Sequence, residues 1–125
     1  PPVPMREIAE RINGYDIEII FLPPTNMNLR FALPNKLFES IQGRLGIVMG
    51  ESPAMVEVVR EYGDGVVVEG WGSADLLRTL EALSYEDVVR MKAASDLAAR
   101  TLNAEQEGRV FLALIGPPAT IPATD

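Results

Sequence analysis

Short apolar runs alternate with amphipathic segments along most of the chain. A first helix is predicted over 5–13 because apolar residues recur there at the spacing of one helical face, with Gly14 as its stop. A β-branched run follows at 17–22, and the two prolines after it end the strand that it predicts. Glu18 alone interrupts this run, which indicates either a strand covered on both faces or an edge strand.

The same alternation is repeated in the next part of the chain. The polar stretch 25–30 is predicted to be a loop, because its asparagines favour turns. A short helix is predicted from Pro34 to a stop at Gly43, since a proline is tolerated in a first turn where its missing N–H would be unpaired anyway. The apolar run 46–49 then predicts a second strand.

A third unit begins at Ser52, which is predicted to cap a helix that has Pro53 in its first turn. The Gly-Asp-Gly sequence around Asp64 predicts a turn, and turn geometry alone would explain this aspartate. A third strand is predicted over 66–69. Trp71 lies between two glycines in a predicted loop, where we expect its ring to pack, either as a cap on the core or against a further domain.

Three helices are predicted after the last strand. Ser73 is expected to cap the first of them, and Ser84 with Asp87 resembles a capping box that opens the second. Asn103 with Gln106 is a similar pair and predicts a last helix that reaches about residue 115. The residues 116–125 are expected to form a flexible tail.

This order of elements predicts an α/β fold with a small three-stranded parallel sheet and flanking helices, because helical crossovers join parallel strands. The chain contains no internal repeat and no linker that would divide it. Three strands make a very small parallel sheet, and such sheets normally bury both faces. We therefore expect the chain to be one segment of a larger α/β domain.

Composition narrows the range of functions. The chain has 125 residues, 47% of them hydrophobic, and a net charge of −7, which disfavours nonspecific binding to nucleic acid. It contains no cysteine and no histidine, and this excludes disulfides, thiol catalysis, an imidazole base and nearly all zinc sites within it. No apolar run approaches the ~18–20 residues of a membrane span, and a cytoplasmic location is the expectation.

The predicted helix 34–43 carries the most suggestive chemistry. Its first turn offers free backbone N–H groups and the positive end of the helix dipole, and Lys36 adds a charge there. Glu39 places a carboxylate one turn further on, so the helix start would suit a nucleotide diphosphate and its ribose. The alternatives are ordinary: Glu39 could be an acid favoured by the dipole, Lys36 a solvated lysine, and Arg30 a member of a surface ion pair.

The residues from 15 to 114 resemble the distal part of the C-terminal domain of retaining GT-B-fold glycosyltransferases, which use nucleotide-diphosphate sugars. The resemblance covers about 100 of the 125 residues. Its most specific part is Leu-Pro-Asn-Lys-Leu-Phe-Glu at 33–39, and the other matching segments are 46–48, 52–59, 62–68 and 72–77. This resemblance implies the distal half of a Rossmann-like GT-B domain, with residues 1–115 forming part of a nucleotide-sugar-binding domain.

The resemblance also implies roles for individual residues. Glu39 matches the family's glutamate that binds both ribose hydroxyls, and Asn35 and Lys36 lie where they could reach phosphate or sugar. The family often has a second glutamate eight residues earlier, and Phe31 occupies that position here. Arg30 and Asn28 could contact the sugar in its place, so these two residues complete the predicted substrate-binding set, in which no residue is assigned to catalysis or metal binding.

Two parts of the family's machinery would have to lie outside this chain: the N-terminal acceptor domain and the Arg/Lys pair that grips the pyrophosphate. The chain is thus expected to bind a UDP- or GDP-sugar, without a cofactor and without nucleic acid, and to be inactive alone. The whole enzyme would serve polysaccharide or glycolipid assembly and could associate with a membrane surface. The alternatives are a non-catalytic α/β module that forms a homodimer through the sheet edge at 17–22, and a sugar-nucleotide epimerase of the same fold.

Overall fold

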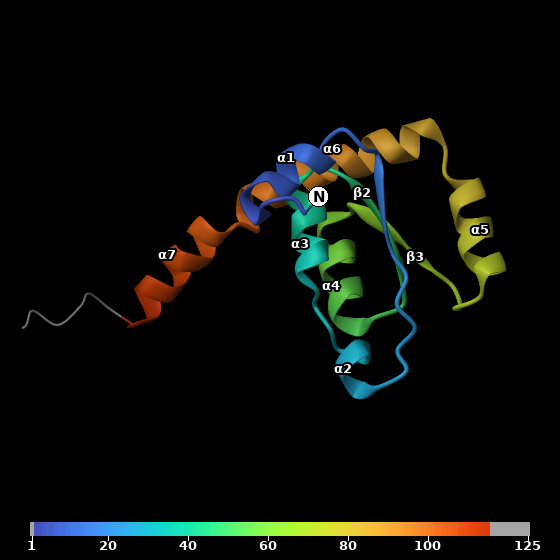
Figure 1. Cartoon of the computed structure of the whole chain (residues 1–125), viewed down its shortest axis with the longest axis horizontal. Helices are drawn as coiled ribbons and strands as arrows, with labels where there is room; N and C mark the ends of the chain where they lie inside the picture. Colours follow the sequence, from blue (N-terminus) through green and yellow to red (C-terminus); the bar gives the residue numbers. More distant parts are fainter. Residues whose placement is uncertain (1, 116–125) are drawn as a thin grey trace, which may run out of the picture.

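The computed structural model describes residues 2–115 of the protein, and the predicted tail 116–125 lies outside them. Figure 1 shows a small sheet with helices around it. The strands are β1 (Ile17–Ile20), β2 (Gly46–Gly50) and β3 (Gly65–Val68). The helical elements are the 3-10 turn η1 (Met5–Glu7), α1 (Ile8–Ile12), α2 (Met27–Arg30), α3 (Asn35–Gln42), α4 (Pro53–Tyr62), α5 (Ser73–Ala82), α6 (Tyr85–Thr101) and α7 (Ala104–Ile115).

The three strands form one parallel sheet in the order β1-β2-β3. Ile17 lies opposite Gly46, and Ile47 lies opposite Gly65, so the strands run side by side over most of their length. The protein therefore has the predicted α/β architecture with a small parallel sheet and flanking helices. Glu18 lies in an edge strand of this sheet, which agrees with the second of the two interpretations of the run 17–22.

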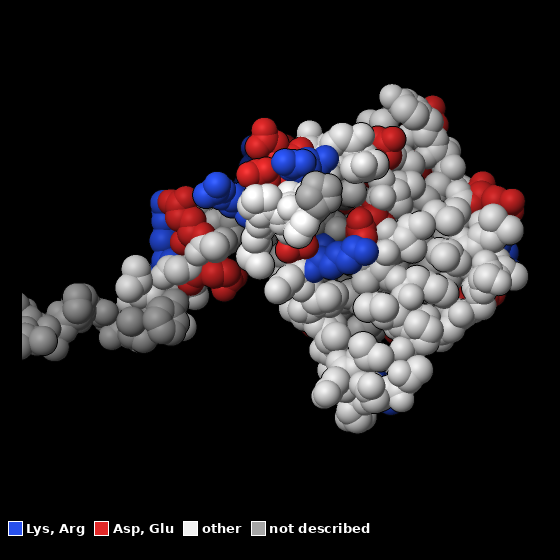
Figure 2. All heavy atoms as spheres, in the orientation of Figure 1, with Lys and Arg blue, Asp and Glu red and all other residues white. Residues whose placement is uncertain are grey.

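The outer edge of β1 has no neighbouring strand within residues 2–115. Ile19 is 41% exposed and Leu22, just beyond the strand, is 49% exposed. Figure 2 shows charged side chains toward the top and left of the view, a basic patch with acidic neighbours at the centre over α3 and acidic side chains at the right over α5, while the lower part of this face is largely uncharged. The β1 edge thus combines unpaired backbone groups with exposed apolar side chains, and the strand itself contains neither lysine nor proline.

One face of the sheet packs closely against α3 and α4. The main buried cluster joins side chains of these two helices to every second residue of the strands and to the end of α6. Its fully or almost fully buried members are Ile20, Leu37, Ile41, Ile47, Met49, Met55, Val56, Val59, Ala98 and Ala99. This layer fixes the position of α3, the helix that carries the candidate site.

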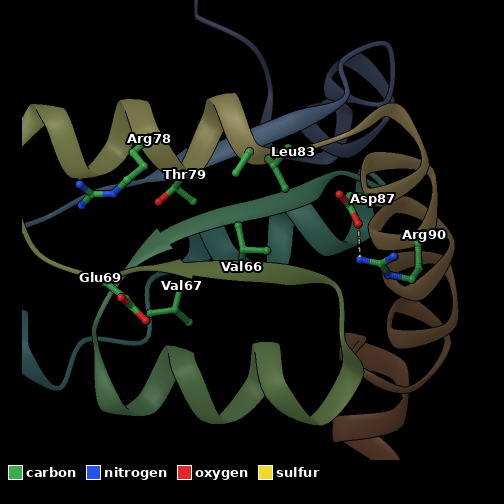
Figure 3. Close-up of a pocket in the computed structure, with 9 residues that line it drawn as sticks. Val66, Val67, Glu69, Arg78, Thr79, Leu83, Asp87 and Arg90 are labelled. Carbon is green, nitrogen blue, oxygen red and sulfur yellow. Dashed lines mark hydrogen bonds and ion pairs between the residues drawn. The ribbon is translucent and has the colours of Figure 1, made fainter.

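The other face of the sheet lies under α5, on the opposite side of β3 from α4 (Figure 3). Trp71 packs here, with its ring centroid 5.1 Å from that of Phe21. A Cβ atom on Gly50 would overlap the Trp71 ring, so a glycine is needed at that position. The tryptophan therefore packs within the protein, as expected.

The long helix α6 crosses the end of the sheet where the strands begin. The buried hydroxyl of Ser95 donates a hydrogen bond to the Leu45 carbonyl at 2.5 Å. Lys92 reaches the chain just before β1, where its ammonium group donates to the carbonyl of Tyr15 at 2.7 Å and pairs with Asp16 at 3.0 Å. These contacts hold the entry of β1 and β2 against one helix.

Several sequence-based boundaries were wrong. The predicted loop 25–30 contains the short helix α2, because the Asn26 side chain accepts a hydrogen bond from the Leu29 N–H at 2.9 Å and caps it. The predicted helix 5–13 is a 3-10 turn followed by one α-helical turn and a half. The strand predicted over 17–22 ends at Ile20.

The predicted caps had mixed outcomes. Ser84 with Asp87 forms the expected capping box, and Asn103 accepts from the Gln106 N–H at 3.0 Å. Ser52 occupies the N-cap of α4 but makes no capping bond, since its hydroxyl donates to the Arg30 carbonyl. Ser73 is the first residue of α5 rather than its cap: Gly72 holds that position.

Candidate functional site

The candidate site is built on α3, whose N-terminus follows the crossover from the carboxyl end of β1. Pro34 occupies the N-cap in an extended conformation and makes no side-chain cap. The first-turn N–H groups therefore lack a side-chain acceptor from their own cap, as the sequence indicated. Asn35 and Lys36 are both exposed at this end of the helix.

Lys36 forms an ion pair that the sequence did not reveal. Its ammonium nitrogen lies 2.5 Å from a carboxylate oxygen of Glu18, and the Lys36 side chain is 57% exposed. The partner comes from β1, the edge strand that α3 packs against. The charge of Lys36 is therefore partly neutralised, and the interruption at Glu18 acquires a structural explanation.

Glu39 lies one turn beyond Lys36 and is half-buried. Among the described residues, its carboxylate has neither a hydrogen bond nor an ion pair, whereas its backbone carbonyl accepts from Gly43 at 2.8 Å. The next residue on the helix, Ser40, is buried and donates to the Lys36 carbonyl at 2.7 Å. The Glu39 side chain thus leaves a packed helix with its oxygens available to a ligand.

Arg30 and Asn28 lie on α2, not in a loop, and both are exposed. The guanidinium of Arg30 lies 5.7 Å from the centroid of the neighbouring Phe31 ring. No hydrogen bond or ion pair among the described residues joins either side chain to α3. The structure therefore brings Asn35, Lys36 and Glu39 together on one helix and leaves Arg30 and Asn28 on another.

Phe31, which lies between α2 and α3, is 54% exposed. The segment after it leads directly into Pro34 and the start of α3. An aromatic ring at this position can stack on a ligand or pack against it, but it cannot accept a hydrogen bond from a sugar hydroxyl as a carboxylate does.

A separate hollow lies at the β3 edge, away from α3 (Figure 3). Its volume is about 390 Å³, and β3, α5 and α6 line it. The lining residues are Val66, Val67, Glu69, Arg78, Thr79, Ala82, Leu83, Asp87 and Arg90. None of the five predicted site residues belongs to this hollow.

Three of the charged groups of this hollow, Arg78, Asp87 and Arg90, belong to ion pairs at the starts of α5 and α6. Hydrogen bonds from the Ser84 backbone and hydroxyl, followed by Arg90, lower the pKa of Asp87 to about 2. On α5, a hydrogen bond from the Gly72 N–H and a second from Arg78 lower the pKa of Asp75. Each acid is thus an ionised cap with its own arginine partner, and neither is suited to proton transfer near neutral pH.

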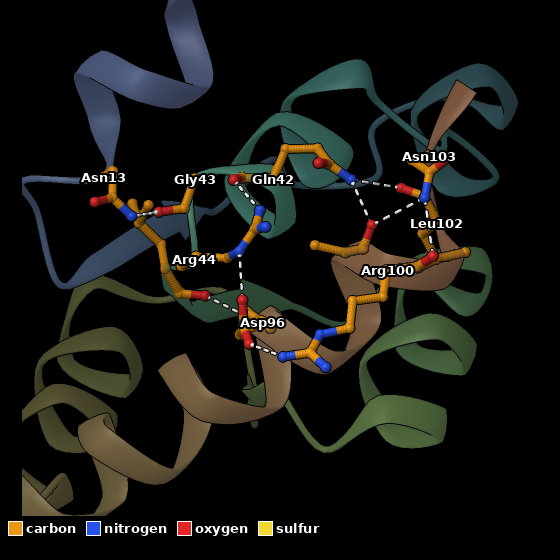
Figure 4. A network of polar contacts seen from close by, with 11 residues as sticks. Asn13, Gln42, Gly43, Arg44, Asp96, Arg100, Leu102 and Asn103 are labelled. Carbon is orange, nitrogen blue, oxygen red and sulfur yellow. Dashed lines mark hydrogen bonds and ion pairs between the residues drawn. The ribbon is translucent and has the colours of Figure 1, made fainter. Parts of the chain in front are cut away.

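A second hollow, of about 330 Å³, adjoins a polar network between α1, α3 and α6 (Figure 4). Arg44 pairs with Asp96 at 2.9 Å and also donates to the Gln42 carbonyl. Gln42 in turn donates to the Leu102 carbonyl at 2.7 Å. The network provides hydrogen-bond donors for the backbone carbonyls at the ends of two helices, which is a structural role. Arg44 adopts the left-handed backbone conformation, with a φ of 62°.

Two further features of the described residues bear on the type of site. Within residues 2–115, no three acidic side chains are placed to hold a metal ion. No helix of this part of the chain is long and apolar enough to cross a membrane. The candidate site therefore remains the start and second turn of α3, with Glu39 as its ionisable group.

Comparison with known proteins adds no family to these observations. No protein-family model matches the chain, and neither a curated protein nor a solved structure matches it.

Proposed function

We propose that this protein forms the donor-nucleotide-binding part of a GT-B-type glycosyltransferase. In this proposal Glu39 accepts hydrogen bonds from both ribose hydroxyls, and the start of α3 faces the diphosphate. The sugar then extends toward Phe31 and α2. The chain supplies binding and orientation, and the acceptor site and the remaining pyrophosphate contacts come from other parts of the enzyme.

The observation that carries the proposal is the state of Glu39. Its carboxylate is half-buried and free of protein partners among the described residues, on a helix fixed by the core. In open α/β sheets, ligands bind outside the carboxyl ends of the strands, and α3 begins at that side of this sheet. The sequence around Glu39, with its resemblance to the glycosyltransferase motif, supports the same ligand.

The ion pair between Lys36 and Glu18 changes which groups are expected to contact the diphosphate. A phosphate that recruited Lys36 would have to compete with a carboxylate 2.5 Å away. The backbone N–H groups of the first turn and the Asn35 amide have no such competitor within the described residues. We therefore assign the phosphate contacts chiefly to the helix start and a smaller contribution to Lys36.

Titration calorimetry with UDP and with GDP tests the proposal. A hydrogen bond that involves a charged group contributes about 1.5–3 kcal/mol, so Glu39→Gln should weaken the binding of the preferred nucleotide by about ten- to a hundredfold. The matched control is Glu57→Gln on α4, because Glu57 is exposed and makes no ion pair in the described structure. The control should leave the dissociation constant unchanged.

Two results would contradict the assignment. One is a dissociation constant that Glu39→Gln and Glu57→Gln change equally. The other is the absence of binding of either nucleotide to the unmodified protein at millimolar concentration. Circular dichroism of each variant separates loss of binding from loss of fold.

The free edge of β1 supports a second candidate, a module that associates with its own copy. Exposed apolar side chains beside unpaired backbone groups favour the addition of a strand. Two β1 edges related by a two-fold axis would form a continuous six-stranded sheet. Ile19 would lie at the centre of this contact.

Light scattering on a sizing column tests this candidate. We expect a dimer for the unmodified protein and a monomer for Ile19→Lys, because a lysine on the edge would be buried at the contact. Leu77→Lys is the control, since Leu77 is an exposed leucine on α5 and lies away from β1. A monomer at all protein concentrations would rule out the self-associating module.

A further inference from the structure

Asp64 is a buried acid in the turn between α4 and β3. Asp64 is 0% exposed, and neither of its carboxylate oxygens accepts a hydrogen bond from any other described residue. The desolvation of a carboxylate disfavours its ionised form unless a donor or a positive charge compensates. Asp64 is therefore different from Asp75, Asp87 and Asp96, which all have arginine partners.

The backbone around Asp64 is held closely on both sides. Gly63 ends α4 in the left-handed conformation, with a φ of 70°. A Cβ atom on Gly65 would overlap the backbone of Ile47, so the strand that follows approaches β2 closely. The Asp64 carbonyl accepts from the Ile47 N–H at 3.0 Å and starts the pairing of β3 with β2. Solvation of the carboxylate therefore requires this turn to open.

Titratable groups near the turn come from three helices. Burial raises the pKa of Tyr62, and the negative charges of Glu61, Asp64 and Glu107 raise it further, so acids of α4 and α7 lie near Tyr62. On α6, Arg90 lines the hollow beside Val66 and is paired with Asp87 at 2.7 Å. From β2, the described contact is the uncharged Ile47 backbone. Burial also raises the pKa of Asp64 from 3.8 to about 6, although its own backbone N–H partly opposes the rise.

We propose that Asp64 is a proton-operated latch for β3. The turn stays packed and β3 stays paired with β2 while the carboxyl is protonated, and ionisation favours opening of the turn. The folded state binds the proton more tightly than the open state does. The latch is therefore strongest below the ordinary aspartate pKa and weakens as the pH rises through the raised value.

Hydrogen exchange of the Ile47 amide measures the opening directly. Its opening constant should rise about tenfold per pH unit between pH 4 and pH 6, about a hundredfold in all, after correction for the intrinsic exchange rate. Asp64→Asn should remove this rise, because the amide does not ionise. Glu61→Gln is the control: it removes a neighbouring exposed acid and should keep most of the rise.

A second measurement protects the test against a variant that fails to fold. The carboxyl carbon resonance of Asp64 in the unmodified protein should titrate near pH 6. A titration near pH 4 would overturn the proposal, and it would mean that water or a protein donor solvates the carboxylate. Equal pH dependence of the Ile47 opening constant in the unmodified protein and in Asp64→Asn would also overturn it.

Discussion

The helices α3 and α4 bury several side chains completely on one face of the sheet, whereas none of the residues described in α5 is fully buried on the other. Both faces of the sheet are apolar, and the helices that cover them carry leucines or valines at helical spacing. The difference lies in depth of packing. The α3/α4 face forms a rigid base for Glu39, and the α5 face is held by a looser contact in which Trp71 has a central part.

The difference in packing between the two faces indicates where a ligand can be bound with precision. Side chains on a well-packed helix are held in place by their neighbours, and a binding group needs such support. Glu39 has it, because Ser40 and Ile41 beside it are buried. The hollow at the β3 edge lacks comparable support from α5, and three of its charged groups, Arg78, Asp87 and Arg90, are engaged in ion pairs at helix starts.

The largest predicted effect compares one core residue on each face. Ile41→Ala should lower the free energy of unfolding by about 2–5 kcal/mol, because Ile41 is fully buried and its removal leaves a cavity. Leu80→Ala on α5 should lower it by less, about 1 kcal/mol, since Leu80 is only half-buried. Urea denaturation followed by circular dichroism measures both values. Equal losses of unfolding free energy in the two variants would contradict the difference in packing between the two faces of the sheet.

A smaller effect is predicted at the contact between Gly50 and Trp71. Gly50→Ala should destabilise the protein by about 1–3 kcal/mol, because the new methyl group would overlap the indole ring. Gly14→Ala is the control, since a Cβ atom there meets nothing within 4 Å. Thermal unfolding compares the two variants. If Gly50→Ala were as stable as the control, Trp71 would not pack closely on β2.

Much of the fold could be predicted from the sequence, because its determinants are local. The β-branched runs and the helices between them specified three parallel strands, and the capping box at Ser84 specified the start of α6. The helix α2 was missed because four residues give no hydrophobic period, and its only signal was Asn26 as a cap. Ser73 was misplaced because the bond at this helix start is donated by the Gly72 N–H to the Asp75 carboxylate, and no hydroxyl takes part.

Less of the candidate site could be predicted, because its decisive contacts are not local. The order of residues placed Asn35, Lys36 and Glu39 on one helix. The pairing of Lys36 with Glu18 joins residues from different elements, and a single sequence carries no signal for it. The burial of Asp64 was hidden for a similar reason, since a Gly-Asp-Gly sequence is typical of an exposed turn.

We propose that the second turn of α3 binds a nucleotide. Titration of the ¹⁵N-labelled protein with UDP and with GDP, followed by amide chemical shifts, tests it most directly. We predict saturable shifts that concentrate on residues 35–40, with the Glu39 amide among them. Shifts concentrated on the β3 hollow around Val66 and Thr79, or none at saturating nucleotide, would contradict the account.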